Sequence, residues 1–261
     1  AFHVMLSGIP VAEKLVKDER IAMLSFTGSD KVGWHLKAIC GKKKVALELG
    51  GNASVIIDEN TDLANAAKAV AMGANLYAGQ TCISTQRIYV VKSVHDQFRD
   101  LLAKEFGELK SGDPNDPAVS VGPIIDKGHF ERIGSWVGEA VKGGANVLAG
   151  GKAIDAERNI YAATLLSHTK PEMKVNCAEV FGPVAVIEAV ADCREAIAKV
   201  NDSNYGLQAG VYTNSIAHMK LAHEELEVGG IIINSIPGFR IDSMPYGGVK
   251  DSGLGREGLK Y

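Results

Sequence analysis

The sequence predicts an α/β fold, built on an open, mostly parallel twisted sheet with helices on both faces. Short apolar runs alternate along the 261 residues with longer segments of helical periodicity, which is the element order of parallel α/β sheets. With 46% hydrophobic and 23% charged residues, the composition is typical of a folded globular protein and excludes a disordered or fibrous chain. A chain of this length forms one large domain, or one domain with part of another.

The first expected strand is residues 21–26, after which Thr27–Gly28–Ser29–Asp30 supplies a turn and an N-cap for a helix ending near residue 39. Helical spacing of apolar residues and runs of β-branched residues place the later elements. The later expected strands are residues 45–49, 53–57, 87–91, 145–148, 162–166, 184–190, 209–213 and 229–234, and the later expected helices are residues 62–77, 94–109, 127–142, 194–201 and 215–226.

Two segments are expected to be irregular. Residues 110–126 contain three prolines and three aspartates, so we expect a loop over the surface rather than a linker between domains. Residues 236–258 are rich in glycine and contain two prolines, so they cannot form one regular element. Their composition suits a loop that approaches a ligand.

Charge and hydropathy exclude several classes of partner. The net charge is −3, from 28 basic and 31 acidic residues, which gives no electrostatic footprint for nucleic acid. No apolar stretch approaches the roughly 18 residues that cross a bilayer, so no membrane partner is expected. The opening lacks the basic start of a signal peptide, which favours a cytoplasmic location, and the missing initiator Met suggests a truncated chain.

The four cysteines lie far apart and form no CxxC pair, so neither a zinc site nor a disulfide framework is expected. Cys82 differs from the others because it follows a Gly-Gln-Thr loop, where an electropositive backbone favours the nucleophilic thiolate. Its position after a glycine loop is equally compatible with a structural cysteine.

Glu48 stands in an otherwise apolar expected strand that runs directly into Gly50 and Gly51. At the carboxyl end of a strand in an open α/β sheet, its side chain would reach the crevice where such folds bind ligands. Partial burial would raise the pKa of this carboxyl and suit it to general-base catalysis near neutral pH. The alternative is a salt-bridged carboxylate at the edge of the sheet.

The turn Thr27–Gly28–Ser29 offers backbone N–H groups and a hydroxyl where a helix dipole favours an anion, so a phosphate is one candidate ligand. Such turns are also common as simple N-caps. The glycines after Gly28 do not complete the GxGxxG fingerprint of dinucleotide-binding folds.

Five short motifs follow one another along the chain: FTGS (26–29), ELGGN (48–52), GQTC (79–82), EVFGP (179–183) and PYGGVKDSGLGREG (245–258). In their order and spacing they resemble the aldehyde dehydrogenase family over nearly the whole chain. The 34-residue step from Glu48 to Cys82 is also similar to the family's spacing between base and nucleophile.

The resemblance implies a covalent mechanism in which the Cys82 thiolate attacks an aldehyde and hydride leaves for a nicotinamide. The oxyanion would be held by the backbone N–H of Cys82 and by an asparagine upstream of this chain. Glu48 would then deprotonate the water that releases the carboxylic acid from a thioester.

The same resemblance implies NAD or NADP as cofactor, with Ser29 at the pyrophosphate, Glu179 at the nicotinamide ribose and Phe181 near the nicotinamide. Glu257 would assist proton transfer. Arg240, in a tail similar to those of lactaldehyde and succinic semialdehyde dehydrogenases, either pairs with a substrate anion or is a solvated loop arginine. The implied cofactor-binding residues are Thr27, Gly28, Ser29, Leu49, Gly50, Glu179 and Phe181.

Members of the family are about twice as long as this chain, so we expect a division into three parts. Residues 1–47 would close a nucleotide-binding domain, residues 48–240 would form the catalytic domain, and residues 241–261 would return to the active site as a tail. The family also implies a homodimer or homotetramer.

The expected activity is therefore oxidation of a small aldehyde with NAD or NADP. Two alternatives stay open: an inactive or partner-binding fragment of such an enzyme, since the chain encodes only part of a cofactor site, and a thiol-dependent esterase, which would keep Cys82 and Glu48 without a nicotinamide.

Overall fold

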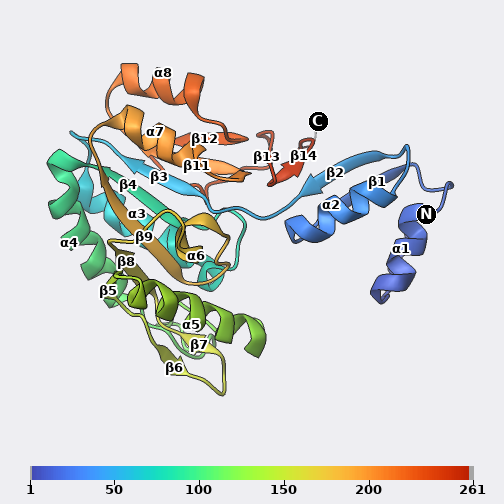
Figure 1. Cartoon of the computed structure of the whole chain (residues 1–261), viewed down its shortest axis with the longest axis horizontal. Helices are drawn as coiled ribbons and strands as arrows, with labels where there is room; N and C mark the ends of the chain where they lie inside the picture. Colours follow the sequence, from blue (N-terminus) through green and yellow to red (C-terminus); the bar gives the residue numbers. More distant parts are fainter. Residues whose placement is uncertain (1, 259–261) are drawn as a thin grey trace.

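The computed structural model, which describes residues 2–258, places a seven-stranded sheet at the centre of the molecule and a three-stranded sheet beside it (Figure 1). In the large sheet the strand order is β12-β11-β3-β4-β9-β8-β5, and every pairing is parallel except that of β8 with β5. The predicted open, mostly parallel sheet is confirmed. The helices are α1 (Ile9–Lys17), α2 (Asp30–Ile39), α3 (Leu63–Asn75), the 3-10 helix η1 (Leu76–Gly79), α4 (Lys92–Glu108), α5 (Lys127–Lys142), α6 (Lys174–Cys177), α7 (Cys193–Asn201) and α8 (Ile216–Glu225), and the strands are β1 (Met23–Thr27), β2 (Lys44–Glu48), β3 (Ser54–Ile57), β4 (Arg87–Val91), β5 (Asn146–Ala149), β6 (Ala153–Asp155), β7 (Ile160–Tyr161), β8 (Thr164–Ser167), β9 (Val184–Val190), β10 (Tyr205–Gly206), β11 (Gln208–Tyr212), β12 (Gly230–Ile233), β13 (Val249–Lys250) and β14 (Gly253–Leu254).

Helices cover both faces of the large sheet, as predicted, because its central strands are apolar on both sides. All four residues of β3 are buried. Val55 and Ile57 contribute to the core beneath α3, α4 and α5, whereas Ile56 points to the opposite core, beneath α7 and α8. This alternation follows from the two-residue period of a strand. A strand that is buried on both faces has a nearly continuous run of apolar residues, and such a run predicts the strand at residues 53–57.

The small sheet joins two ends of the chain. β1 and β2 are parallel, with Thr27 opposite Glu48, and β14 of the tail pairs antiparallel with β2, with Gly253 opposite Glu48. Helix α2 packs on this sheet through Leu36 and Cys40. The tail therefore reaches the strand that ends in Glu48 (Figure 1).

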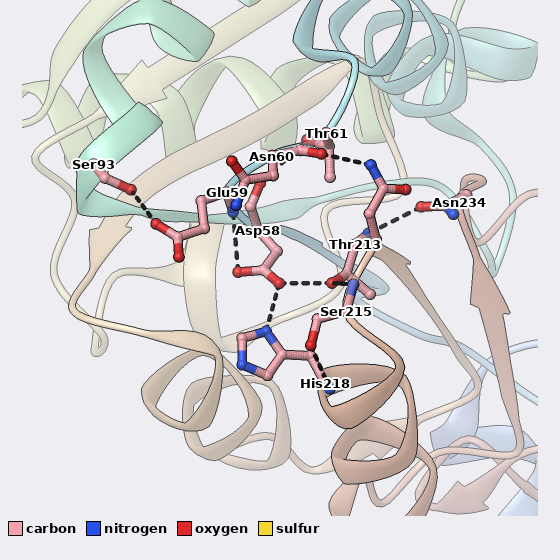
Figure 2. Close-up of polar contacts among 10 residues, drawn as sticks. Asp58, Glu59, Asn60, Thr61, Ser93, Thr213, Ser215, His218 and Asn234 are labelled. Carbon is pink, nitrogen blue, oxygen red and sulfur yellow. Dashed lines mark hydrogen bonds and ion pairs between the residues drawn. The ribbon is translucent and has the colours of Figure 1, made fainter.

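A polar network fixes the carboxyl edge of the large sheet (Figure 2). Asp58 follows β3 and is 2% exposed, and its carboxylate accepts a hydrogen bond from Thr213 Oγ1 at 2.6 Å and lies 2.5 Å from His218 Nδ1 of α8. The backbone N–H of Thr213 donates to Asn234 Oδ1 at 2.9 Å, and Ser215 caps α8 by accepting from the N–H of His218. The loops after β3, β11 and β12 are thus tied to one another and to α8.

Three expectations about elements need correction. Residues 9–17 form α1, although we assigned no element there; a proline at its start and lysines in its last turn were the available signals. The helix expected over 62–77 ends at Asn75, because Tyr77 and Ala78 have positive φ values of 50° and 57°. Ser29 occupies the N-cap of α2, but its side chain makes no capping hydrogen bond.

Short strands β6, β7, β10, β13 and β14 were not expected, because each is only two or three residues long. No helix within residues 2–258 is long and apolar enough to cross a membrane.

Candidate active site

Glu48 is the last residue of β2, at the edge where the small sheet meets the large one. The backbone N–H of Gly28 donates to the carbonyl of Glu48 at 3.1 Å, so the Thr27–Gly28–Ser29 turn begins beside it. The N–H of Leu49 donates to the carbonyl of Ser252 at 2.9 Å. The chain that leads from Glu48 into Gly50 and Gly51 is therefore held from two sides.

Cys82 follows a tightly packed left-handed turn. Ala78 and Gly79 both have positive φ, and a Cβ at Gly79 would lie 2.0 Å from the carbonyl oxygen of Gly182. Only glycine fits this position, because it combines a left-handed backbone with a close backbone approach. On the other side, a Cβ at Gly51 would lie 2.4 Å from the carbonyl oxygen of Cys82. The glycines thus bring the Cys82 loop against the segment that follows Glu48.

The Cys82 thiol is half-buried, and its sulfur lies 3.3 Å from the hydroxyl of Tyr246. Burial raises the pKa of the thiol, the hydrogen bond with Tyr246 lowers it, and the carboxylates of Glu179 and Glu48 raise it further. The sequence analysis placed Tyr246 in a motif but assigned it no role. Only the folded chain brings this tyrosine to Cys82, which lies 164 residues away.

Glu48 has the properties of a general base. Its side chain is 7% exposed, and Oε2 has no hydrogen-bond partner among the described residues. Burial and the nearby carboxylate of Glu257 raise its pKa from 4.5 to about 7, against the opposing effect of Arg240 and Arg256. A carboxyl group with a pKa near 7 exchanges protons readily at neutral pH.

Glu179 lies against the glycines that follow Glu48. Its carboxylate accepts a hydrogen bond from the N–H of Gly51 at 2.8 Å, and a Cβ at Gly50 would lie 2.5 Å from its Oε2. Burial raises the pKa of Glu179 to about 7. Two residues later, Phe181 adopts a positive φ of 47°, an unusual conformation for an aromatic residue that turns the chain sharply.

Arg240 and Glu257 face each other across the tail. Their side chains form an ion pair at 3.2 Å, and the guanidinium of Arg240 lies 4.1 Å from the ring centroid of Tyr246. The backbones of Tyr246 and Glu257 form an antiparallel bridge, which fixes the positions of these two residues. The structure therefore brings Arg240 and Glu257 into the surroundings of Cys82 and Glu48.

The residues around Ser29 lie where β1 leads into α2. Ser29 precedes α2, and its hydroxyl makes no capping bond, so the hydroxyl is available to a ligand. The N–H of Lys31 donates to the Asp30 carboxylate at 2.6 Å. Leu49 is buried under α2, where a Cβ at Gly33 would lie 2.3 Å from its Cδ2. This close contact aims the start of α2 at the edge of the small sheet that carries Thr27 and Glu48.

The predicted residues thus fall into two neighbouring groups. In the first group, Glu48 and Glu179 lie near the Cys82 thiol, and Arg240 and Glu257 lie near Glu48. In the second group, Thr27, Gly28 and Ser29 lie at the amino end of α2, with Thr27 opposite Glu48 in the small sheet. Within residues 2–258, no three histidine, cysteine, aspartate or glutamate side chains are arranged to hold a metal ion.

The chain is similar to proteins of known family. The sequence profile of the aldehyde dehydrogenase family matches residues 1–261. A 3-sulfolactaldehyde dehydrogenase from Priestia aryabhattai is 42% identical over 254 residues, which are 97% of this chain and 53% of that protein.

Solved structures are similar as well. The Physcomitrella patens aldehyde dehydrogenase 21, in complex with the reaction product succinate, superposes with a TM-score of 0.91 at 37% identity, covering 97% of this chain and 52% of that one. A glyceraldehyde-3-phosphate dehydrogenase from Methanocaldococcus jannaschii complexed with NADP gives a TM-score of 0.91 at 39% identity, covering 96% and 54%. The chain spans about half the length of these relatives. A profile match over every residue, with relatives this similar, shows that the chain belongs to the aldehyde dehydrogenase family.

Proposed function

We propose that the protein oxidises an aldehyde to a carboxylic acid with NAD or NADP, through a thioester on Cys82 and with Glu48 as general base. The observation that carries this proposal is the approach of two reactive groups, one from the end of strand β2 and one from the loop after η1. A half-buried thiol lies beside a buried carboxyl whose pKa is about 7 and whose Oε2 has no partner among the described residues.

In the first step the Cys82 thiolate attacks the carbonyl carbon, a carbon–sulfur bond forms, and the carbonyl electron pair moves to oxygen. The backbone N–H of Cys82 stabilises that oxyanion. Bound NAD or NADP supplies the acceptor for the hydride that leaves the carbon. A thioester on Cys82 remains.

In the second step Glu48 takes a proton from water as the water oxygen attacks the thioester carbon. The carbon–sulfur bond breaks, the carboxylic acid leaves, and the thiolate is restored. Because the pKa of Glu48 is about 7, the basic form accumulates as pH rises through 7. We expect the rate of thioester hydrolysis to rise through this range and then reach a plateau.

The residues that would hold the cofactor are those of the α2 start and of the Glu179 loop. Thr27, Gly28 and Ser29 would bind the pyrophosphate, Leu49 and Gly50 would form the surface beneath it, and Glu179 would bind the nicotinamide ribose. Phe181 would lie beside the nicotinamide. Two observations support this assignment: the hydroxyl of Ser29 makes no capping hydrogen bond, and the carboxylate of Glu179 packs closely against Gly50.

We further propose that Arg240 binds an anionic group on the aldehyde, with Glu257 assisting proton transfer. Relatives named for 3-sulfolactaldehyde, and a structure holding succinate, support this choice, since both compounds carry an anionic group. Arg240→Ala should raise KM for anionic aldehydes and leave KM for neutral ones unchanged, whereas Arg158→Ala, at an exposed arginine outside the site, should change neither. An equal effect on both classes of aldehyde would contradict the assignment.

The activity is tested by incubating the protein with NAD or NADP and a panel of small aldehydes while the absorbance of reduced nicotinamide is followed. The signal should vanish in Cys82→Ala and persist in Cys177→Ala, which removes an exposed cysteine outside the site. A signal that persists in Cys82→Ala would refute the mechanism. Release of nitrophenol from an ester by Cys82 without nicotinamide reduction would indicate the thiol esterase, and no acyl-enzyme at all would indicate a partner-binding fragment.

The division of the chain and its assembly are part of the same proposal. Residues 1–47 would belong to the nucleotide-binding domain, residues 48–240 to the catalytic domain and residues 241–261 to a tail over the active site. A homodimer or homotetramer is proposed as well, because β12 is an outer strand of the large sheet, and outer strands favour pairing with another chain. Light scattering measures the assembly.

A further inference from the structure

We propose that Tyr246 is a further catalytic residue, whose hydroxyl donates a hydrogen bond to the sulfur of Cys82 and stabilises the thiolate that attacks the aldehyde. This inference rests on the proposed function, in which Cys82 is the nucleophile. The motif that contains Tyr246 does not by itself indicate a chemical role for this side chain.

The phenol of Tyr246 lies within hydrogen-bond distance of the Cys82 sulfur. The hydroxyl oxygen of Tyr246 lies 3.3 Å from the sulfur of Cys82, within the range of a hydrogen bond to sulfur. Tyr246 is 5% exposed, and its backbone is held by two hydrogen bonds with Glu257, of 3.0 and 2.6 Å. A ring fixed by both burial and backbone pairing keeps its hydroxyl at the sulfur without further ordering.

The charges around Cys82 oppose its ionisation, and a hydrogen-bond donor offsets them. Reactive thiols usually lie beside cationic groups, which favour the thiolate. Here the carboxylates of Glu48, from the end of β2, and Glu179, from the loop after α6, both oppose ionisation of Cys82, as does burial. The hydrogen bond with Tyr246 acts in the opposite direction and lowers the pKa of the thiol.

The surroundings of Tyr246 determine which partner donates. Burial, the neighbouring Cys82 and the carboxylate of Glu48 hold the pKa of this phenol well above its usual value, against the opposing effect of Arg240. The phenol therefore stays protonated over the pH range in which the thiol ionises, so it is the donor. The guanidinium of Arg240, 4.1 Å from the ring centroid, and the carboxylate of Glu257 that pairs with it complete the charged groups around the ring.

A residue that merely filled space would behave differently. Phenylalanine would fill nearly the same volume, and the ionisation of Cys82 would not depend on the hydroxyl. The test must therefore measure the thiolate itself, without aldehyde or nicotinamide.

The measurement is the rate at which iodoacetamide alkylates Cys82 as a function of pH, followed by peptide mass spectrometry in the 261-residue chain. The thiolate displaces iodide, so a carbon–sulfur bond forms as the carbon–iodine bond breaks, and the rate follows the thiolate fraction. Tyr246→Phe should move the Cys82 profile to higher pH and slow alkylation at neutral pH by about tenfold, the effect of one pKa unit. The exposed Cys177 reports on the reagent in the same sample and should be unaffected.

The matched control is Tyr212→Phe, which removes a buried hydroxyl at the far end of β11 and should leave the Cys82 profile unchanged. A second variant keeps the test decisive if Tyr246→Phe fails to fold. Incorporating 3-fluorotyrosine at position 246 preserves the ring and makes the phenol a stronger donor, so it should move the profile to lower pH. A Cys82 profile that is the same in wild type and in the folded variants at position 246, or that moves in the opposite direction, overturns the inference.

The proposed dehydrogenase function and the role of Tyr246 can be refuted independently. Loss of turnover in Cys82→Ala tests the proposed function, whereas the alkylation profile tests the hydrogen bond from Tyr246 even in a protein without dehydrogenase activity.

Discussion

Replacing Glu48 with glutamine is expected to change the stability of the protein in a way that depends on pH. In the folded chain the carboxyl is buried and its pKa is raised from 4.5 to about 7. The folded state therefore binds this proton more tightly than the unfolded state does. The stabilisation that results is fully present below pH 4.5, and it is lost as pH rises to 7 and the buried carboxylate becomes charged.

The structure sets the size of the effect. One pKa unit corresponds to about 1.4 kcal/mol, so the raised pKa of Glu48 lowers the unfolding free energy by at most about 3 kcal/mol above pH 7. Glutamine does not titrate, so the variant avoids this loss. Burying an amide in place of the carboxyl adds an offset, but the offset does not vary with pH. The difference in unfolding free energy, variant minus wild type, should therefore increase by about 3 kcal/mol between pH 4.5 and 7.5.

Urea denaturation of both proteins at several pH values from 4.5 to 8 measures this difference. Glu179, whose pKa is also raised, is present in both proteins, so its contribution cancels. The matched control is Glu157→Gln, at an exposed glutamate, for which we expect a difference that does not change with pH. A Glu48→Gln difference that stayed flat with pH would show that burial does not hold this carboxyl in its protonated form, and the argument for Glu48 as a general base would lose its physical basis.

Two further substitutions test the packing that supports the site. Gly79→Ala should destabilise the protein by more than about 2 kcal/mol, because the backbone is left-handed and the new Cβ would lie 2.0 Å from a carbonyl oxygen. Gly107→Ala, in the last turn of α4 where a Cβ meets open space, should instead stabilise it by up to about 1 kcal/mol. Thermal melts of the two variants that agreed would contradict this reading. Thr213→Val should cost about 2 kcal/mol, because it removes the 2.6 Å hydrogen bond to buried Asp58, and should lower Tm by several degrees, whereas Thr213→Ser should melt close to wild type. Equal melting of the Val and Ser variants would show that the hydroxyl does not stabilise the sheet edge.

Most of the fold could be predicted because its signals are local. Residues 55–57 and 184–187 are apolar and buried, and the helix at residues 127–142 is amphipathic, so the type of these elements follows from the local pattern. The ends were less predictable. The helix that begins at Leu63 stops two residues before its expected end, because Tyr77 and Ala78 adopt left-handed backbone conformations that residue preference does not predict.

The candidate site residues also divide into those that the sequence indicates and those that only the folded chain brings together. Cys82 and Glu48 could be named as candidates from the sequence. One follows a glycine loop, the other ends an apolar strand, and both fall in motifs that resemble those of the aldehyde dehydrogenase family. Only the tertiary structure brought Tyr246 to the thiol, paired Arg240 with Glu257, and raised the pKa of Glu48. Each of these features depends on distances and burial between segments that are far apart in the sequence. No local pattern of residues determines them.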